Sequence, residues 1–442
     1  MDLLPSTVSL SISDKQSQNG FCNKFHSREG AVHMEKVSIL GVDLAKASFT
    51  ACGLDEKGNK VLRREFRTDS FKAYLGKSEK ITVIMEACGG AHYWSRFAKS
   101  CGHETKIVAP QKVVGFRKNN KNDKNDAFAI CITGTCPGME FVPTKTVDQQ
   151  DIQAVLRMRS RLISNQTALV NSIRGILTEY GVTVSKGIQF IRAALSDIAS
   201  NPDCEHNKYL TSIILDLVKD INIELIEVTE RIEKADKMIL RLTKGNENCI
   251  KLQAIPGVGP LIAATVVSTL INPEDYKNGR QFAASIGLTP KHVQTGGKDS
   301  KPIQLGISKC GNAELRSLLV QGAMSTLNAV RVRQERLDNQ NASKPIEKES
   351  KGNLERNANP IEGRGNAQHP SRQLSKQKNE KKIMSKTREQ WILKLYAEKG
   401  TQKTAVALAN KTARMIHAIL KSGGTYQPDL AYSAHGQKSV AA

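Results

Sequence analysis

Residues 36–44, KVSILGVDL, and residues 81–87, ITVIMEA, are the two stretches that decide the fold. Each is an apolar run of strand length with several Val and Ile residues, and such runs predict buried strands. A single carboxylate stands at the end of each run, Asp43 in the first and Glu86 in the second. A charge at the end of a buried strand is costly unless it has a purpose. We therefore expect both carboxylates to serve a site at one edge of a sheet.

The residues between and after these runs predict the rest of an α/β domain. Turn residues at 55–59 separate two runs of strand character and indicate a hairpin. Three antiparallel strands followed by alternating strands and helices are typical of a ribonuclease H-like α/β sheet. Further strands are expected at 48–55, 60–68 and 106–110, and helices near 70–76 and 92–100.

Two more carboxylates, Asp123 and Asp126, lie in the polar string KNNKNDKNDAFAI. Their i, i+3 spacing places both on one face of a helix. Lys121 and Lys124 flank them, so a salt-bridge cluster at a helix start is the alternative. Four carboxylates at one point repel each other strongly unless a divalent cation lies among them. The pattern predicts a Mg²⁺ site for phosphoryl transfer, with two ions about 4 Å apart.

Composition points to a nucleic-acid partner. The 442 residues carry 65 Lys and Arg against 43 Asp and Glu, a formal net charge of +22. Such a surplus favours a polyanion, although ribosomal and membrane-surface proteins share it. No apolar run approaches about 20 residues, so no membrane partner is expected. The nine cysteines show no C-x-x-C spacing, which predicts a reducing cytoplasm rather than a zinc site or disulfide framework.

The middle of the chain is helical in pattern. Residues 148–180 form one expected helix, and apolar residues step by three and four from 207 to 244. A stripe of that length predicts the seam of a coiled coil or of an antiparallel helical hairpin. Burial of this helix against its own domain is the alternative.

The segment IPGVGP begins a compact helical region and fits a helix-hairpin-helix. Its glycines, Gly257 and Gly259, would let backbone amides approach a DNA phosphate without reading bases. A tight turn between two packed helices is the plainer interpretation.

The loop QTGGKDSKPIQLGISKCGN, residues 294–312, combines glycines, hydroxyls and lysines. An ordinary surface loop is one interpretation, and a phosphate-binding loop with Lys298 and Lys309 is the other. In the second case the hydroxyl of Thr295 or Ser308 would attack phosphorus, which requires activation by a base or a metal. His292 is a candidate base. The residues alone leave the choice between Thr295 and Ser308 open.

Several motifs together resemble the DEDD-type insertion-sequence transposases of the IS one-ten family. The resemblance runs from about residue 36 to 426 and is interrupted only at 338–385. The motifs occur in the family's order: GVDLAKASF, VIMEACGGAHYW, KNDKNDAFA, LQAIPGVGPLIA, RQFAASIGLTP, TGGK, GISKCGNAELR and VALANKTAR.

The resemblance implies a RuvC-like N-terminal domain whose acidic tetrad falls on Asp43, Glu86, Asp123 and Asp126. It also implies a nucleophilic hydroxyl five residues after Pro290, which is Thr295, and Ser308 falls on a different motif. The family usually has Ser there, and the extra methyl group of Thr crowds the attack. The insertion at 338–385 is a second departure, compatible with a tolerated loop or a decayed element.

The implied activity is that of a bacterial transposase or recombinase, associated with the nucleoid, that excises and inserts a mobile element. An RNA encoded by the element would pair with donor and target DNA, and a covalent protein–DNA intermediate would precede strand exchange. Homodimers held by the coiled coil would pair into a homotetramer. A RuvC-like structure-specific nuclease and a catalytically decayed transposase that only binds nucleic acid are the alternatives.

These expectations divide the chain into consecutive regions. Residues 1–33 are polar and patternless, which predicts a disordered leader or a start at Met34. The regions after it are a RuvC-like domain at 36–147, a helical coiled-coil region at 148–247, a mostly α transposase domain at 248–337, a disordered insertion at 338–385, C-terminal helices at 386–426 and a disordered tail at 427–442.

Overall fold

The computed structural model describes residues 37–46, 48–116, 123–270, 272–293, 303–342 and 370–428. For residues 123–124, 304, 341–342 and 370–387 the backbone alone is described. The chain divides into two compact units, which meet in sequence between Thr146 and Val147.

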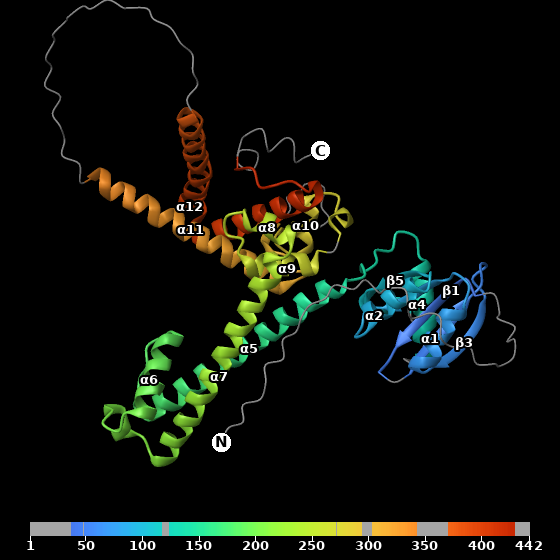
Figure 1. Cartoon of the computed structure of the whole chain (residues 1–442), viewed down its shortest axis with the longest axis horizontal. Helices are drawn as coiled ribbons and strands as arrows, with labels where there is room; N and C mark the ends of the chain where they lie inside the picture. Colours follow the sequence, from blue (N-terminus) through green and yellow to red (C-terminus); the bar gives the residue numbers. More distant parts are fainter. Residues whose placement is uncertain are drawn as a thin grey trace, which may run out of the picture. The chain divides into compact units, whose positions relative to one another are not determined.

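The first unit is built on a mixed five-stranded sheet (Figure 1). Strand β1 pairs antiparallel with β2 and parallel with β4, and the order across the sheet is β3-β2-β1-β4-β5. The predicted antiparallel hairpins and the change to parallel pairing are therefore confirmed. The strands are β1 (Ile39–Leu44), β2 (Phe49–Leu54), β3 (Lys60–Phe66), β4 (Thr82–Glu86) and β5 (Glu104–Val108).

Helices cover both faces of this sheet. On one face, helices α1 (Thr68–Lys77) and α2 (Ala91–Ser100) bury an aromatic cluster that includes Phe71 and Trp94. On the other face, helix α4 (Asp123–Thr135) packs on the sheet, with the short helix α3 (Pro110–Val114) beside it. Because both faces are covered, β1 and β4 are buried along most of their length, as their continuous apolar sequences predict.

The second unit begins with a pair of long antiparallel helices, α5 (Val147–Glu179) and α7 (Ser212–Lys244). The start of α5 contacts the end of α7, where Ile152 clusters with Ile239, and the end of α5 contacts the start of α7. Helix α6 (Ile188–Ser200) joins the pair near the start of α7. A 3-10 turn occupies Glu205–Tyr209, so α7 begins five residues later than the apolar stripe predicts.

The apolar stripe of α7 is thus used within its own chain. Its buried positions face α5 and α6, and Arg159 of α5 forms an ion pair with Asp236 of α7 at 2.5 Å between Nε and Oδ1. This arrangement is the predicted antiparallel helical hairpin. A coiled coil with a second copy of the chain stays a prediction.

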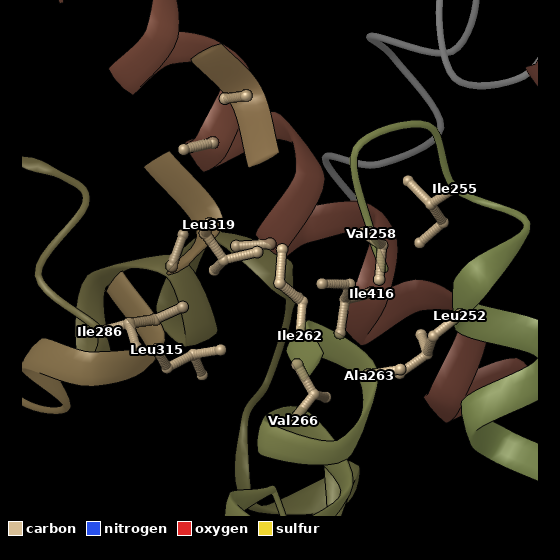
Figure 2. Packing of buried hydrophobic residues seen from close by; sticks show 14 of the residues in the cluster. Leu252, Ile255, Val258, Ile262, Ala263, Val266, Ile286, Leu315, Leu319 and Ile416 are labelled. Carbon is tan, nitrogen blue, oxygen red and sulfur yellow. The ribbon is translucent and has the colours of Figure 1, made fainter. Parts of the chain in front are cut away.

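A separate core forms where the C-terminal helices meet (Figure 2). Leu252 and Ile262 pack there with Leu319 and Ile416, which come from distant parts of the sequence. The elements are α8 (Glu247–Gln253), α9 (Pro260–Thr269), a 3-10 turn (Pro273–Asp275), α10 (Gly279–Ser285), the hairpin of β6 (Pro290–Val293) and β7 (Ile303–Ile307), α11 (Ala313–Ala342) and α12 (Pro370–Ser422).

Helices α11 and α12 flank the predicted insertion and extend into it. Residues 338–342 and 370–385 are helical, whereas disorder is expected there from their composition. Helix α12 is interrupted at Gly400, whose φ of 73° is left-handed, so two helices follow each other as the sequence predicts. Residues 343–369 lie outside the described residues, as do 1–36 and 429–442.

Candidate active site

Strands β1 and β4 bring Asp43 and Glu86 to the same edge of the sheet. Val42 pairs with Met85 in the parallel ladder, and each carboxylate follows one residue later. Adjacent strands lie about 4.8 Å apart, so the two backbones are close neighbours at this point. The predicted convergence of these two acids therefore follows from the strand register.

Both carboxylates lie on the face of the sheet that α4 covers. Side chains two residues apart on a strand share a face, so Asp43 lies on the face of Gly41, and Glu86 on the face of Ile84. A Cβ on Gly41 would lie 2.5 Å from the Ala127 carbonyl oxygen of α4, and a Cβ on Gly134 would meet Ile84. The absence of a side chain at Gly41 lets α4 approach β1 this closely.

Helix α4 carries the other two predicted acids. Asp126 immediately precedes the contact of Ala127 with Gly41, and its side chain is 4% exposed. Asp123 begins the helix, and only its backbone is described. Sequence spacing alone could not show that Asp126 is buried, because that depends on how close the helix lies to β1.

The thiol of Cys88 lies close to the first two carboxylates. It lies beyond the end of β4, where Sγ is 3.8 Å from the Leu44 carbonyl oxygen at the end of β1. Partial burial of the thiol raises the pKa of Cys88, and the negative charges of Glu86 and Asp43 raise it further. The negative charges of both carboxylates therefore reach the same thiol. Cys88 was not predicted as part of the site, although it stands only two residues after Glu86 in the sequence.

A second candidate site lies at the hairpin of β6 and β7 in the other unit. Thr295 and Lys298 belong to residues 294–302, between the two strands in the sequence, which lie outside the described residues. The root of the hairpin is held by two glycines, Gly287 and Gly311, both with left-handed φ. A Cβ on Gly311 would lie 1.8 Å from the Ser285 carbonyl oxygen, and one on Gly287 would lie 2.4 Å from that of Cys310. A residue with a Cβ at either position would clash with these carbonyl oxygens.

Two polar side chains tie the hairpin root to the helices around it. The Arg316 guanidinium of α11 donates to the carbonyl oxygens of Ile286 at 3.0 Å and Cys310 at 2.8 Å. The Asn410 amide of α12 donates to the Leu288 carbonyl oxygen at 3.1 Å. Both come from motifs quoted above, GISKCGNAELR and VALANKTAR, so these motifs fix the described ends of β6 and β7 against the helices.

The IPGVGP turn joins α8 to α9, and a helix-hairpin-helix that binds nucleic acid there stays a prediction. Gly257 has a φ of 87° and packs on α11, where a Cβ would lie 2.5 Å from Thr326 Oγ1 and 2.7 Å from the Gly322 carbonyl oxygen. Gly259 has no atom within 4 Å of its Cβ position. Packing thus explains why position 257 requires glycine, and phosphate contacts at Gly257 and Gly259 stay predictions. Lys309 is exposed, with a left-handed φ of 56°.

Comparisons with known proteins place these sites in a family. Residues 40–182 match a transposase family of the DEDD, IS110 type, and residues 249–338 match the transposase IS116/IS110/IS902 family. The transposase for insertion sequence element IS1111A of Coxiella burnetii is 34% identical over 394 residues, which cover 89% of this chain and 92% of that protein. The chain belongs to the IS110 family of transposases.

Other relatives agree with this assignment. A probable family 20 transposase of Pseudomonas aeruginosa is 30% identical over 89% of this chain and 99% of its own length. The pilin gene-inverting protein of Moraxella lacunata is 22% identical over 65% of this chain and 82% of its own length. The protein is therefore a bacterial insertion-sequence transposase, an enzyme of DNA recombination and strand transfer, and is expected to bind DNA.

Transposases of the DEDD type are generally metal-dependent. Among the described side chains, no three His, Cys, Asp or Glu residues gather closely enough to hold a metal ion, and the Asp123 carboxylate falls outside that set. The side chains present are oxygen donors, which suit Mg²⁺. The strand register brings Asp43 and Glu86 together, and the role of these carboxylates and of those on α4 as metal ligands stays a prediction. Within the described residues, no helix is long and apolar enough to cross a membrane.

Proposed function

We propose that this transposase cuts and rejoins DNA by attack of the Thr295 hydroxyl on a backbone phosphate, assisted by Mg²⁺ at the acidic tetrad. The observation that carries the proposal is the register that aligns Asp43 with Glu86 at the end of two parallel strands. Asp126 and Asp123 of α4 would complete the ligand set. When bound, the two cations would supply positive charge that stabilises the charge developing on the phosphate.

In the proposed step, a bond forms between Thr295 Oγ and phosphorus while one ester P–O bond of the DNA backbone breaks. The Thr295 hydroxyl loses its proton and the departing nucleoside oxygen gains one, so the step consumes and releases no net proton. The number of phosphoester bonds is unchanged, so the reverse attack by another DNA end rejoins the strand without an added energy source. Arg316 and Asn410 hold the described strands on either side of the segment that contains Thr295.

We also propose a guide RNA, an assembly of several copies and contacts to the nucleic-acid backbone. An RNA encoded by the element would choose the donor and target DNA, and the large positive charge suits a complex with two nucleic acids. Two or four copies of the chain would assemble, so that the carboxylates of one copy meet Thr295 of another. Gly257, Gly259, Lys298 and Lys309 are proposed contacts to the nucleic-acid backbone.

A covalent adduct tests the nucleophile. The protein is incubated with Mg²⁺, the element's RNA and labelled DNA carrying an element end, and the products are separated in denaturing detergent. We expect a labelled protein band that disappears in Thr295→Ala and persists in Thr295→Ser. Cleavage that survives Thr295→Ala would instead show a nuclease that uses water. Normal nucleic-acid binding without cleavage, unchanged by Asp43→Ala, would show a transposase that has lost its chemistry.

A further inference from the structure

The edge strand β3 carries exposed charged residues on the face of the sheet where the carboxylates lie. The ladder aligns Asp43 with Thr50 and Thr50 with Glu65, and one step back it aligns Gly41 with Cys52 and Cys52 with Arg63. Partners in a ladder share a face, so these side chains lie on the face that α4 covers. Helix α4 buries Cys52 but leaves Arg63 and Glu65 exposed.

The positive charge of Arg63 is directed over this face. Three influences set the pKa of Cys52: a hydrogen bond from the Cys131 thiol lowers it, burial raises it, and the charges of Lys60 and Arg63 lower it again, to about 7. Lys60 Nζ stacks 3.5 Å from the centre of the Phe128 ring of α4. Among the described residues, no carboxylate forms an ion pair with Arg63.

The next residue, Arg64, lies on the opposite face. Its guanidinium carbon is 5.1 Å from the centre of the Phe66 ring, and its charge lowers the pKa of Tyr74, although burial raises that pKa more. Strand alternation thus separates two arginines of equal charge, one beside the carboxylates and one against α1.

We propose that Arg63 binds a backbone phosphate of the DNA strand on which the carboxylates act. This inference rests on the proposed function, because it takes that strand to pass over Asp43. Arg63 lies two strands from Gly41, about 10 Å across the sheet, and its long side chain spans part of that distance. A DNA strand that leaves Asp43 straight across β2 passes Thr50 and then Glu65, and Arg63 lies two residues from Glu65 on the same face of β3.

Protection of the sheet edge is the competing explanation for charged residues on β3, because edge strands often carry charges that prevent pairing with another chain. That role does not depend on which face a charge occupies. A comparison of Arg63 with Arg64 therefore separates the two explanations.

The test measures DNA affinity without cleavage. A short fluorescein-labelled DNA duplex is titrated with the full-length protein in chelator by anisotropy, between about 50 and 200 mM salt. We expect Arg63→Gln to weaken binding by about three- to tenfold at the lower salt and to reduce the slope of log K against log[salt] by about 1. Arg63→Lys is expected to restore most of the slope, and Arg64→Gln to leave it unchanged.

Equal effects of Arg63→Gln and Arg64→Gln would overturn the proposal, because they would reflect total charge alone. An effect on a structured RNA of similar length, with none on DNA, would also overturn it and assign Arg63 to RNA. Since no adduct is measured, failure of the Thr295 experiment would not alter this result. Equal melting temperatures of the three variants serve as the folding control.

Discussion

Gly41 is the residue on which the geometry of the carboxylates depends most. Its missing side chain brings the Ala127 carbonyl and the Cys131 thiol against β1, and Asp126 is buried as a result. The sequence showed a glycine inside an apolar run but not what approaches it. The places of Asp43 and Glu86 were predictable because strand ends follow local hydrophobic pattern, whereas the depth of Asp126 depends on a contact between distant residues.

Gly41→Ala is expected to destabilise the first unit. The added Cβ would lie 2.5 Å from backbone and sulfur atoms of α4, and such overpacking costs about 1–3 kcal/mol. Gly76→Ala in α1 is the matched control: its Cβ meets nothing within 4 Å, and alanine favours a helix by about 0.5–1 kcal/mol. Denaturant unfolding of both variants measures the difference. Equal stability of the two would contradict the close approach of α4.

Removing one carboxylate charge is expected to make Cys88 more reactive. The negative charges of Glu86 and Asp43 help hold the pKa of this thiol above its usual value of 9.0. Glu86→Gln removes one of them, so the pKa falls and more thiolate is present at a fixed pH below 9. Peptide mass spectrometry after iodoacetamide pulses measures the rate at Cys88, with the exposed Cys310 as the internal control. An unchanged alkylation rate at Cys88 would show that the charge of Glu86 does not raise the pKa of this thiol.

The type and length of helix α7 could be predicted from the sequence, but its packing partner could not. The stripe of apolar residues gave its type and length, because helical periodicity is a local property. The partner of the stripe could not be predicted, since packing against α5 and α6 and packing against another copy need the same sequence pattern. Its start also differs: Thr211 caps the helix, with Oγ1 accepting from the Ile214 amide at 3.4 Å.

The same helix yields a stability prediction. Leu225 is fully buried against the helices of its own chain, whereas Ile223, two residues earlier, is 57% exposed. We expect Leu225→Ala to lower the free energy of unfolding by about 2–5 kcal/mol and Ile223→Ala to change it little. The measurement is denaturant unfolding at several protein concentrations. A loss for Leu225→Ala that depends on protein concentration would place the stripe between chains instead.

At the scale of the whole molecule, motif order and excess charge were enough to predict the family, which the comparisons confirm. The acidic tetrad and Thr295 belong to different compact units. Their meeting in one active site stays a prediction, because no local pattern encodes how distant segments, or separate copies, come together. Arg63 was missed for a related reason: its face is set by the register of β3, which shifts at Gly53 and Leu54.

The metal site at the ends of β1 and β4 is tested most directly by a Mn²⁺ titration of the full-length protein. Binding is followed by electron paramagnetic resonance, with Mn²⁺ in place of Mg²⁺. We predict binding that weakens at least about tenfold in Asp43→Asn and in Glu86→Gln, because each loses a charged oxygen ligand. Glu56→Gln, at an exposed turn of the same unit, should bind as the unaltered protein does. Equal Mn²⁺ affinity in all four proteins would contradict a metal site at the ends of β1 and β4.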